Sequence, residues 1–252
     1  MGGGTAQRYA VVSCHVERLL DDEVWRRYRA LLARSPGGFA IASLLRPPDP
    51  AFGEDEDLWL ARANEAAVLG PVGHHTHWTA PDHARPVTDG TGERVRAEGE
   101  RLRSLGLRPL LFCGGGWYTD ASVAEACAAL GYVDCTPRSA RPEYLDDGAA
   151  WAELDSPTRV VLPSGATLDA LPTTRSLGSL ARALWSRRGP AEPVVHVYFH
   201  DTDLLDRTRS AVLRSVLAVL ARRRHASSPL DLPEPARERS WEELARGRPV
   251  AG

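Results

Sequence analysis

The chain of 252 residues carries 31 basic and 33 acidic side chains, which gives a formal net charge of −2. Every basic side chain among these is an arginine, so the sequence holds no lysine. The missing amine excludes Walker-type phosphate loops, protein kinases, pyridoxal phosphate enzymes and Schiff-base aldolases. The balanced charge predicts no nucleic-acid partner, and no apolar run is long enough to predict a membrane span.

The start of the chain and its cysteines indicate where the protein works. The first residues, up to Arg8, lack the apolar segment of a signal peptide, so we expect a cytoplasmic protein. Cys14, Cys113, Cys127 and Cys135 show no C-x-x-C spacing, and we expect them to be reduced thiols.

Apolar runs alternate with segments of helical periodicity along the chain. Three helical segments end at a Leu-Gly pair, and an apolar run follows each of them. In chain order, we predict strands at residues 9–14, 39–45, 71–75, 109–113, 132–135, 160–162 and 194–199. We predict helices between them at residues 21–34, 55–69, 93–105, 121–130, 176–185 and 204–223.

This alternation predicts an α/β fold with parallel strands and crossover helices, either a β/α barrel or a doubly wound sheet. No G-x-G-x-x-G motif follows the first strand, which argues against a dinucleotide-binding fold. From residue 226 the composition changes to serine, proline and charge, with one short helical signal near its end. We expect this C-terminal tail to be partly ordered.

Chemically active side chains gather at the predicted ends of strands, where the sites of such folds form. The first strand is followed by His15 and Glu17, and the last by His200. The other strand ends carry the segments His74-His75-Thr76-His77-Trp78 and Gly114-Gly115-Gly116-Trp117-Tyr118.

The histidine cluster predicts a metal site. In an extended segment His75 and His77 point the same way and can share one ion, while His74 points to the opposite side. Glu17 is the natural carboxylate partner. The alternatives are a polar loop that is rich in histidine by chance and, for Glu17, a solvated start of the following helix.

Two further features suggest catalysis. His200 closes an apolar strand, so it is a candidate general acid or base, and the alternative is a neighbour of a helix cap. The glycines of residues 114–116 would let backbone N–H groups approach a ligand as in an oxyanion hole, and the alternative is a tight turn. Trp78, Trp117 and Tyr118 offer aromatic faces for a substrate ring.

Taken together, these motifs resemble the NodB-like polysaccharide deacetylases, carbohydrate esterase family 4, from about Tyr9 to Leu220. The resemblance implies a single domain, residues 8–225, folded as a distorted (β/α)7 barrel, with residues 226–252 as the tail. It also implies one divalent metal, usually zinc, and removal of acetyl groups from N-acetylated sugars.

The sequence departs from the family at three motif positions. His15 stands where the family has its base aspartate, and Cys113 stands where the arginine that orients this aspartate is expected. Thr79 occupies the place of the second metal histidine, with His77 two residues earlier. The first two changes fit together, because an arginine at position 113 would lack its carboxylate partner.

The predicted function is a metal-dependent amide hydrolase, an N-deacetylase of a small amino-sugar derivative on a biosynthetic route. Glu17, His75 and His77 would hold the metal. His15 would accept the proton of the attacking water as the base, and His200 would protonate the leaving amine as the acid. Gly115, Gly116, Trp117, Tyr118 and Trp78 would contact the substrate.

Two alternatives remain open at this point. One is another barrel metal hydrolase of the amidohydrolase or deformylase type, although the carbamylated lysine that often bridges two metals cannot form here. The other is a degenerate barrel that binds a glycan or metabolite without catalysis. The oligomeric state is not predicted.

Overall fold

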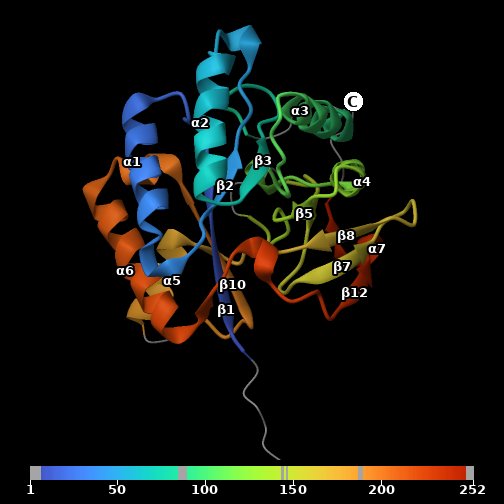
Figure 1. Ribbon diagram of the computed structural model, residues 1–252. Helices are drawn as coiled ribbons and strands as arrows, with labels where there is room; N and C mark the ends of the chain where they lie inside the picture. The colour runs from blue at the N-terminus through green and yellow to red at the C-terminus, as the bar shows by residue number, and fades with distance from the viewer. Residues whose placement is uncertain (1–6, 85–89, 143–144, 146, 187–189, 248–252) are drawn as a thin grey trace, which may run out of the picture.

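The computed structural model describes residues 7–84, 90–142, 145, 147–186 and 190–247. A long sheet forms its centre, with the strand order β12-β7-β8-β5-β4-β3-β2-β1-β10-β9, and β11 pairs with the beginning of β1 (Figure 1). Its first strands in the chain are β1 (Tyr9–Val16), β2 (Ala42–Leu45), β3 (Val72–Thr76), β4 (Leu111–Gly114) and β5 (Val133–Asp134). The later ones are β7 (Thr158–Val161), β8 (Thr167–Ala170), β9 (Arg175–Ser176), β10 (Val194–His200), β11 (His225–Ala226) and β12 (Glu238–Ser240).

The predicted α/β class with a mostly parallel sheet is confirmed. Neighbouring strands from β5 through β1 to β9 are all parallel, and the exception is the antiparallel pair of β7 and β8. Among the described residues, no strand pairing joins β12 to β9. The pairings of the described strands therefore do not show a closed barrel, and the (β/α)7 barrel stays a prediction.

Helices connect the strands, and most begin at a side chain that caps the first turn. The Asp21, Asp55, Asp120 and Asp206 carboxylates accept backbone N–H groups at the starts of four helices, and the Ser176 hydroxyl does so at a fifth. The helices are α1 (Asp22–Arg34), α2 (Glu56–Leu69), α3 (Thr91–Ser104), α4 (Ala121–Ala129), α5 (Leu177–Trp185), α6 (Arg207–Arg223) and α7 (Trp241–Leu244).

The two faces of the sheet bury different sets of side chains. Ala10, Val12 and Cys14 of β1 pack into the apolar cluster that includes residues of α1, α2, α5 and α6. Val11, between them, belongs to a smaller cluster on the other face, with residues of β2 and β4. Because side chains alternate along a strand, His15 lies on the face of Val11, which we call the inner face.

The C-terminal segment adds to the sheet and to its core. The strand β12 pairs with β7 in parallel, and β13 (Ala245–Arg246) pairs with β6 (Trp151–Ala152). Trp241 and Leu244 of α7 are buried in the cluster that also holds residues of α4 and β8. The division of the chain between residues 225 and 226 stays a prediction.

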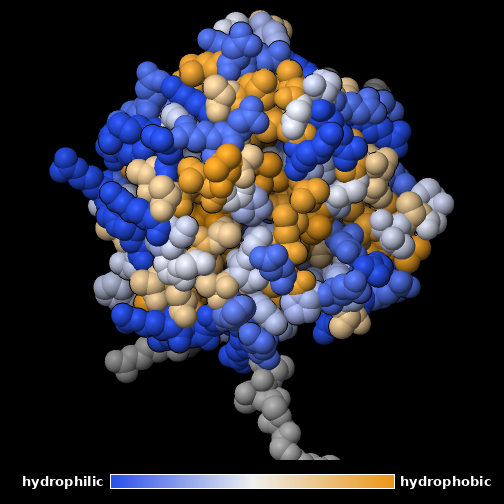
Figure 2. All heavy atoms as spheres, in the orientation of Figure 1, coloured by the Kyte–Doolittle hydropathy of each residue, from blue (hydrophilic) through white to orange (hydrophobic). Residues whose placement is uncertain are grey.

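The surface is mixed in character. Figure 2 shows hydrophobic atoms near the centre of one face, with hydrophilic atoms around its rim. None of the described helices is long and apolar enough to cross a membrane.

One buried carboxyl group gives the fold a defined dependence on pH. Asp134 Oδ1 accepts the Thr136 N–H at 2.8 Å, whereas Oδ2 has no hydrogen-bond partner among the described residues. Burial raises the pKa of Asp134 from 3.8 to about 6. The folded protein therefore binds this proton more tightly than the unfolded chain, and stability is lost as the pH rises from about 4 through 6.

We expect Asp134→Asn, which copies the neutral form of the carboxyl group, to remove this loss. The free energy of unfolding of the variant, relative to the wild type, should increase by about 2 kcal/mol between pH 4 and pH 8. Urea denaturation at the two pH values measures this difference, in which any pH-independent cost of the amide cancels. A difference that does not change with pH would contradict the assignment.

Candidate active site

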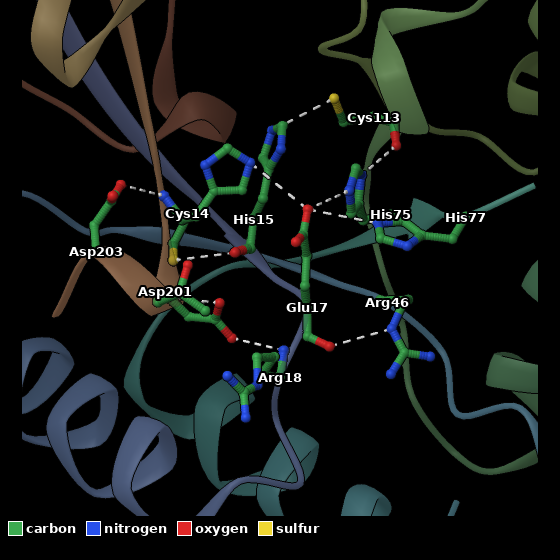
Figure 3. A network of polar contacts seen from close by, with 12 residues as sticks. Cys14, His15, Glu17, Arg18, Arg46, His75, His77, Cys113, Asp201 and Asp203 are labelled. Carbon is green, nitrogen blue, oxygen red and sulfur yellow. Dashed lines mark hydrogen bonds and ion pairs between the residues drawn. The ribbon is translucent and has the colours of Figure 1, made fainter. Parts of the chain in front are cut away.

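The predicted metal and proton-transfer residues meet at the carboxyl ends of β1, β3 and β10. Glu17 directly follows β1, His75 lies within β3, His77 directly follows β3, and His200 ends β10. Parallel strands place these ends at one edge of the sheet, although the residues are far apart in the sequence. Figure 3 shows the Glu17 side chain pointing toward His75 and His77.

The carboxylate of Glu17 lies at a similar distance from three imidazoles. Its Oε1 atom is 3.7 Å from His75 Nε2, 3.5 Å from His77 Nε2 and 3.6 Å from His200 Nε2 (Figure 3). Burial raises the pKa of Glu17, but its contacts with His75 and His77 outweigh this effect and hold the pKa well below the usual range. The group is therefore a carboxylate at neutral pH.

Backbone carbonyls fix the orientation of His75 and His77. His75 Nδ1–H donates to the Cys113 carbonyl at 2.8 Å, and His77 Nδ1–H donates to the Pro81 carbonyl at 2.7 Å. A carbonyl only accepts, so each neutral ring carries its proton on Nδ1 and a lone pair on Nε2. Burial lowers the pKa of His75, which favours this neutral form.

These lone pairs fit a divalent cation. The Nε2 atoms of His75 and His77 are buried and have no hydrogen-bond partner among the described residues. Together with Glu17 they form a set whose ligand atoms lie within 4.8 Å of one another. Ligand bonds of about 2.1 Å in a tetrahedron put donors about 3.4 Å apart, close to the separations from Glu17. Hydrogen bonds from the other ring nitrogen to backbone carbonyls are typical of metal-binding histidines.

His74 belongs to a different network. Its Nε2 atom lies 2.9 Å from Glu98 Oε2, and the same carboxylate accepts the Thr76 hydroxyl at 2.9 Å. The Arg94 Nε–H donates to the other Glu98 oxygen, and its Nη1 donates to the Trp78 carbonyl. The structure thus brings His77, and not His74, to Glu17.

His15 lies at the inner end of the site. It is 3 % exposed, its ring lies 4.5 Å from that of His75, and its Nε2 is 3.6 Å from the Cys113 sulfur. Burial lowers the pKa of His15 well below 6.5, and the neighbouring His75 and His200 lower it further. His15 is therefore a neutral imidazole at neutral pH. The thiol of Cys113 stays protonated, because burial raises its pKa.

An arginine holds the chain where Glu17 leaves β1. The Arg46 Nε–H donates to the Glu17 carbonyl at 3.2 Å, and the Arg46 guanidinium pairs with Glu54. The indole N–H of Trp59 donates to the Arg46 carbonyl at 2.9 Å, which fixes the arginine in turn. The position of Glu17 is thus set by a second layer of buried contacts.

An open cavity of about 390 Å³ lies over these residues. It contains side chains that we predicted for the site and others that the sequence reasoning missed. The predicted ones are His15, Glu17, His75, Gly116, Trp117 and His200, and the missed ones are Asp82, His83, Ala84 and Tyr198. Tyr198 stacks on His15 with the ring centroids 5.2 Å apart. Because Tyr198 lies two residues before His200, strand alternation alone would have placed it on the same face.

The predicted aromatic residues divide into two groups. Trp117 lines the cavity, and the Arg138 guanidinium lies 4.3 Å from its ring centroid. Trp78 and Tyr118 are buried instead and do not line the cavity. The Trp78 indole N–H donates to the Gly115 carbonyl at 2.8 Å, and the Tyr118 hydroxyl donates to Asp120 at 2.6 Å.

The glycine loop after β4 is tightly packed. A Cβ at Gly115 would lie 2.4 Å from the Thr76 carbonyl oxygen, so no larger residue fits there without a shift of the backbone. Gly116 and Trp117 both have positive φ, at 62° and 65°. The value is uncommon for a tryptophan and indicates that the loop is held in a strained form by its surroundings.

The fold is similar to those of three solved proteins. A protein described as a polysaccharide deacetylase from Mycobacterium smegmatis aligns with a TM-score of 0.57 and 12% identity, over 88% of this chain and 86% of that one. The family 4 carbohydrate esterase of Streptomyces lividans aligns with a TM-score of 0.50 and 13% identity, over 92% and 100%. This chain has the fold of the NodB-like deacetylases.

The resemblance predicted from the motifs is thereby confirmed at the level of the fold. A 4-alpha-glucanotransferase of Thermococcus litoralis also aligns, with a TM-score of 0.50 and 11% identity, over 95% of this chain. The chain spans only 40% of the length of that protein. No protein-family model and no curated protein matches the sequence.

Proposed function

We propose that the protein is a metal-dependent amide hydrolase that removes the acetyl group from a small N-acetylated amino-sugar derivative. The observation that carries this proposal is the pair of buried Nε2 lone pairs, on His75 and His77, that face the Glu17 carboxylate. The deacetylase-like fold supports it, and the Streptomyces lividans esterase was crystallised with acetate. The distorted (β/α)7 barrel, the cytoplasmic location and a biosynthetic role belong to the same proposal.

Glu17, His75 and His77 would hold the ion, zinc in our proposal. When bound, a divalent ion of this kind polarises a carbonyl group and makes water more acidic. Imidazole and carboxylate donors of this kind suit zinc, but also iron, cobalt and manganese. The chain supplies the remaining chemistry through residues around this set.

His15 is the proposed base. It is neutral at neutral pH, because burial lowers its pKa, and it lies on the cavity wall beside His75. A neutral imidazole at this position accepts the proton of the attacking water, which is the role of an aspartate in the family that the sequence resembles. Cys113 leaves room for this ring and adds no charge to it.

His200 is the proposed acid, which protonates the leaving amine. Its side chain is 37% exposed and reaches the cavity from the end of β10. Its backbone N–H donates to Asp203 Oδ2 at 3.0 Å, which holds the end of β10 in place. Gly116 and Trp117 are the loop residues positioned to contact the substrate. The Tyr118 N–H already donates to the Gly115 carbonyl, so this group is engaged within the loop.

Removing and restoring the metal tests this function. Protein treated with a chelator should release no acetate from N-acetylglucosamine derivatives, and one equivalent of zinc, cobalt or manganese should restore the release. An enzymatic assay for acetate measures it directly. If no reloaded form releases acetate, or if the chelator has no effect, the protein does not have the proposed activity.

A further inference from the structure

A second cavity, of about 470 Å³, adjoins the site. Its lining comes from the ends of β9 and β10 and from α5 and α6. Tyr198 and His200 line both this cavity and the one that holds Glu17. A ligand that extends past these two side chains would therefore reach both cavities.

The second cavity is mainly apolar. Leu177, Gly178, Ala181 and Val212 belong to its lining. The charged side chains of the lining, Asp203 and Arg209, neutralise each other, because Arg209 Nη1 lies 2.7 Å from Asp203 Oδ1. Such a surface favours an apolar group over a further polar sugar unit.

The position of His200 decides which part of the substrate enters this cavity. The acid that protonates the leaving nitrogen must lie on the amine side of the amide bond. His200 lines both cavities, whereas His15, Glu17 and His75 line the first cavity and not the second. The amine part of the substrate therefore faces the second cavity, and the acyl part stays in the first.

We propose that the second cavity binds an apolar aglycone, an aryl or alkyl group that the amino sugar carries. This inference rests on the proposed deacetylase function and narrows its substrate class to N-acetylated amino sugars with an apolar substituent. A volume of about 470 Å³ lies within the range of pockets for small organic ligands and accommodates a ring system.

Two variants on different helices of the lining, α5 and α6, are designed to fill the cavity. A Cβ at Gly178 would meet only the Arg182 Nη1 atom, at 3.7 Å, so Gly178→Leu fits the fold and also suits a helix better than glycine does. Val212→Phe enlarges a side chain on α6. The matched control is Val68→Phe on α2, where the side chain is 86% exposed and lies outside both cavities.

The substrates are benzyl 2-acetamido-2-deoxyglucopyranoside and its methyl analogue. The wild type and Val68→Phe should prefer the benzyl compound in kcat/KM by about 10-fold or more. Gly178→Leu and Val212→Phe should lose this preference and keep the turnover of the methyl compound within a factor of about 3. A wild type without the preference, or variants that slow both substrates alike, would overturn the subsite.

Two more measurements separate the possible failures. If the variants change the choice between acetyl and butyryl amides instead, the cavity binds the acyl part and the proposal is wrong. Binding of the product amines by calorimetry needs no turnover. If no acetamide is hydrolysed, the proposed function fails. The subsite then stands only if the deacetylated benzyl glycoside binds about 10-fold more tightly than the deacetylated methyl glycoside and Gly178→Leu removes this difference.

Discussion

Replacing His75 or His77 by alanine should weaken zinc binding about 100-fold or more and remove acetate release. Each replacement deletes one buried Nε2 lone pair that faces Glu17 and has no hydrogen-bond partner among the described residues. The Nδ1–H bonds to backbone carbonyls hold the rings in this orientation. Plasma mass spectrometry of the purified protein measures the metal content. Thermal unfolding gives an independent readout, because zinc at about 100 times its Kd stabilises the wild type by about 2.7 kcal/mol.

The control for this prediction is His225→Ala. His225 is an exposed histidine that lies outside the site, and its ring centroid lies 5.6 Å from that of Tyr9. This variant should keep both its metal and its stabilisation by zinc. A His75→Ala or His77→Ala protein that still carries one equivalent of zinc would show that these side chains are not the ligands.

Replacing His15 by alanine should lower kcat/KM by about 10² to 10⁴, with the metal content unchanged. The base must be unprotonated to work, so activity falls as the pH falls through its pKa. Because burial and the neighbouring imidazoles lower the pKa of His15 well below 6.5, the acidic limb of the wild-type pH profile should lie below that value. The measurement is kcat/KM against pH, with metal analysis of each sample.

His200→Ala distinguishes the two proton-transfer roles. His15→Ala and His200→Ala should both keep their metal. They should differ in activity, because an acid is needed only when the leaving group is a poor one. Hydrolysis of 4-nitrophenyl acetate should therefore survive better in His200→Ala than in His15→Ala. Full amide activity in His15→Ala would mean that another group in the cavity, such as Asp82 or His83, is the base.

The alternation of helices and strands was enough to predict the fold class, but the sheet edges were missed. The strand β8 and the edge strands β9 and β12 have only 4, 2 and 3 residues, too few to show a period. The hairpin of β7 and β8 did leave a signal, since Pro163, Ser164 and Gly165 form its turn and Gly165 has φ of 84°. Pairing across an edge depends on tertiary contacts that no local pattern contains.

The site was predictable where it depends on strand geometry. His75 and His77 share one side of an extended segment, and parallel strands bring their end to that of β1, so their approach to Glu17 followed from spacing alone. Trp78 and Tyr118 were harder, because they lie where the chain has left its strand. Their burial depends on loop contacts with Gly115 and Asp120, which alternation does not describe.

A single buried carboxylate links the two halves of the site. Asp201, which follows His200, accepts the backbone N–H of Arg18, which follows Glu17, at 2.8 Å, and it also accepts the Thr202 N–H at 2.8 Å (Figure 3). Local opening of residues 201–204 would therefore release the chain beside the metal carboxylate together with the chain beside the acid. Amide hydrogen exchange should report both segments as one cooperative unit, so that the site is either assembled or lost as a whole.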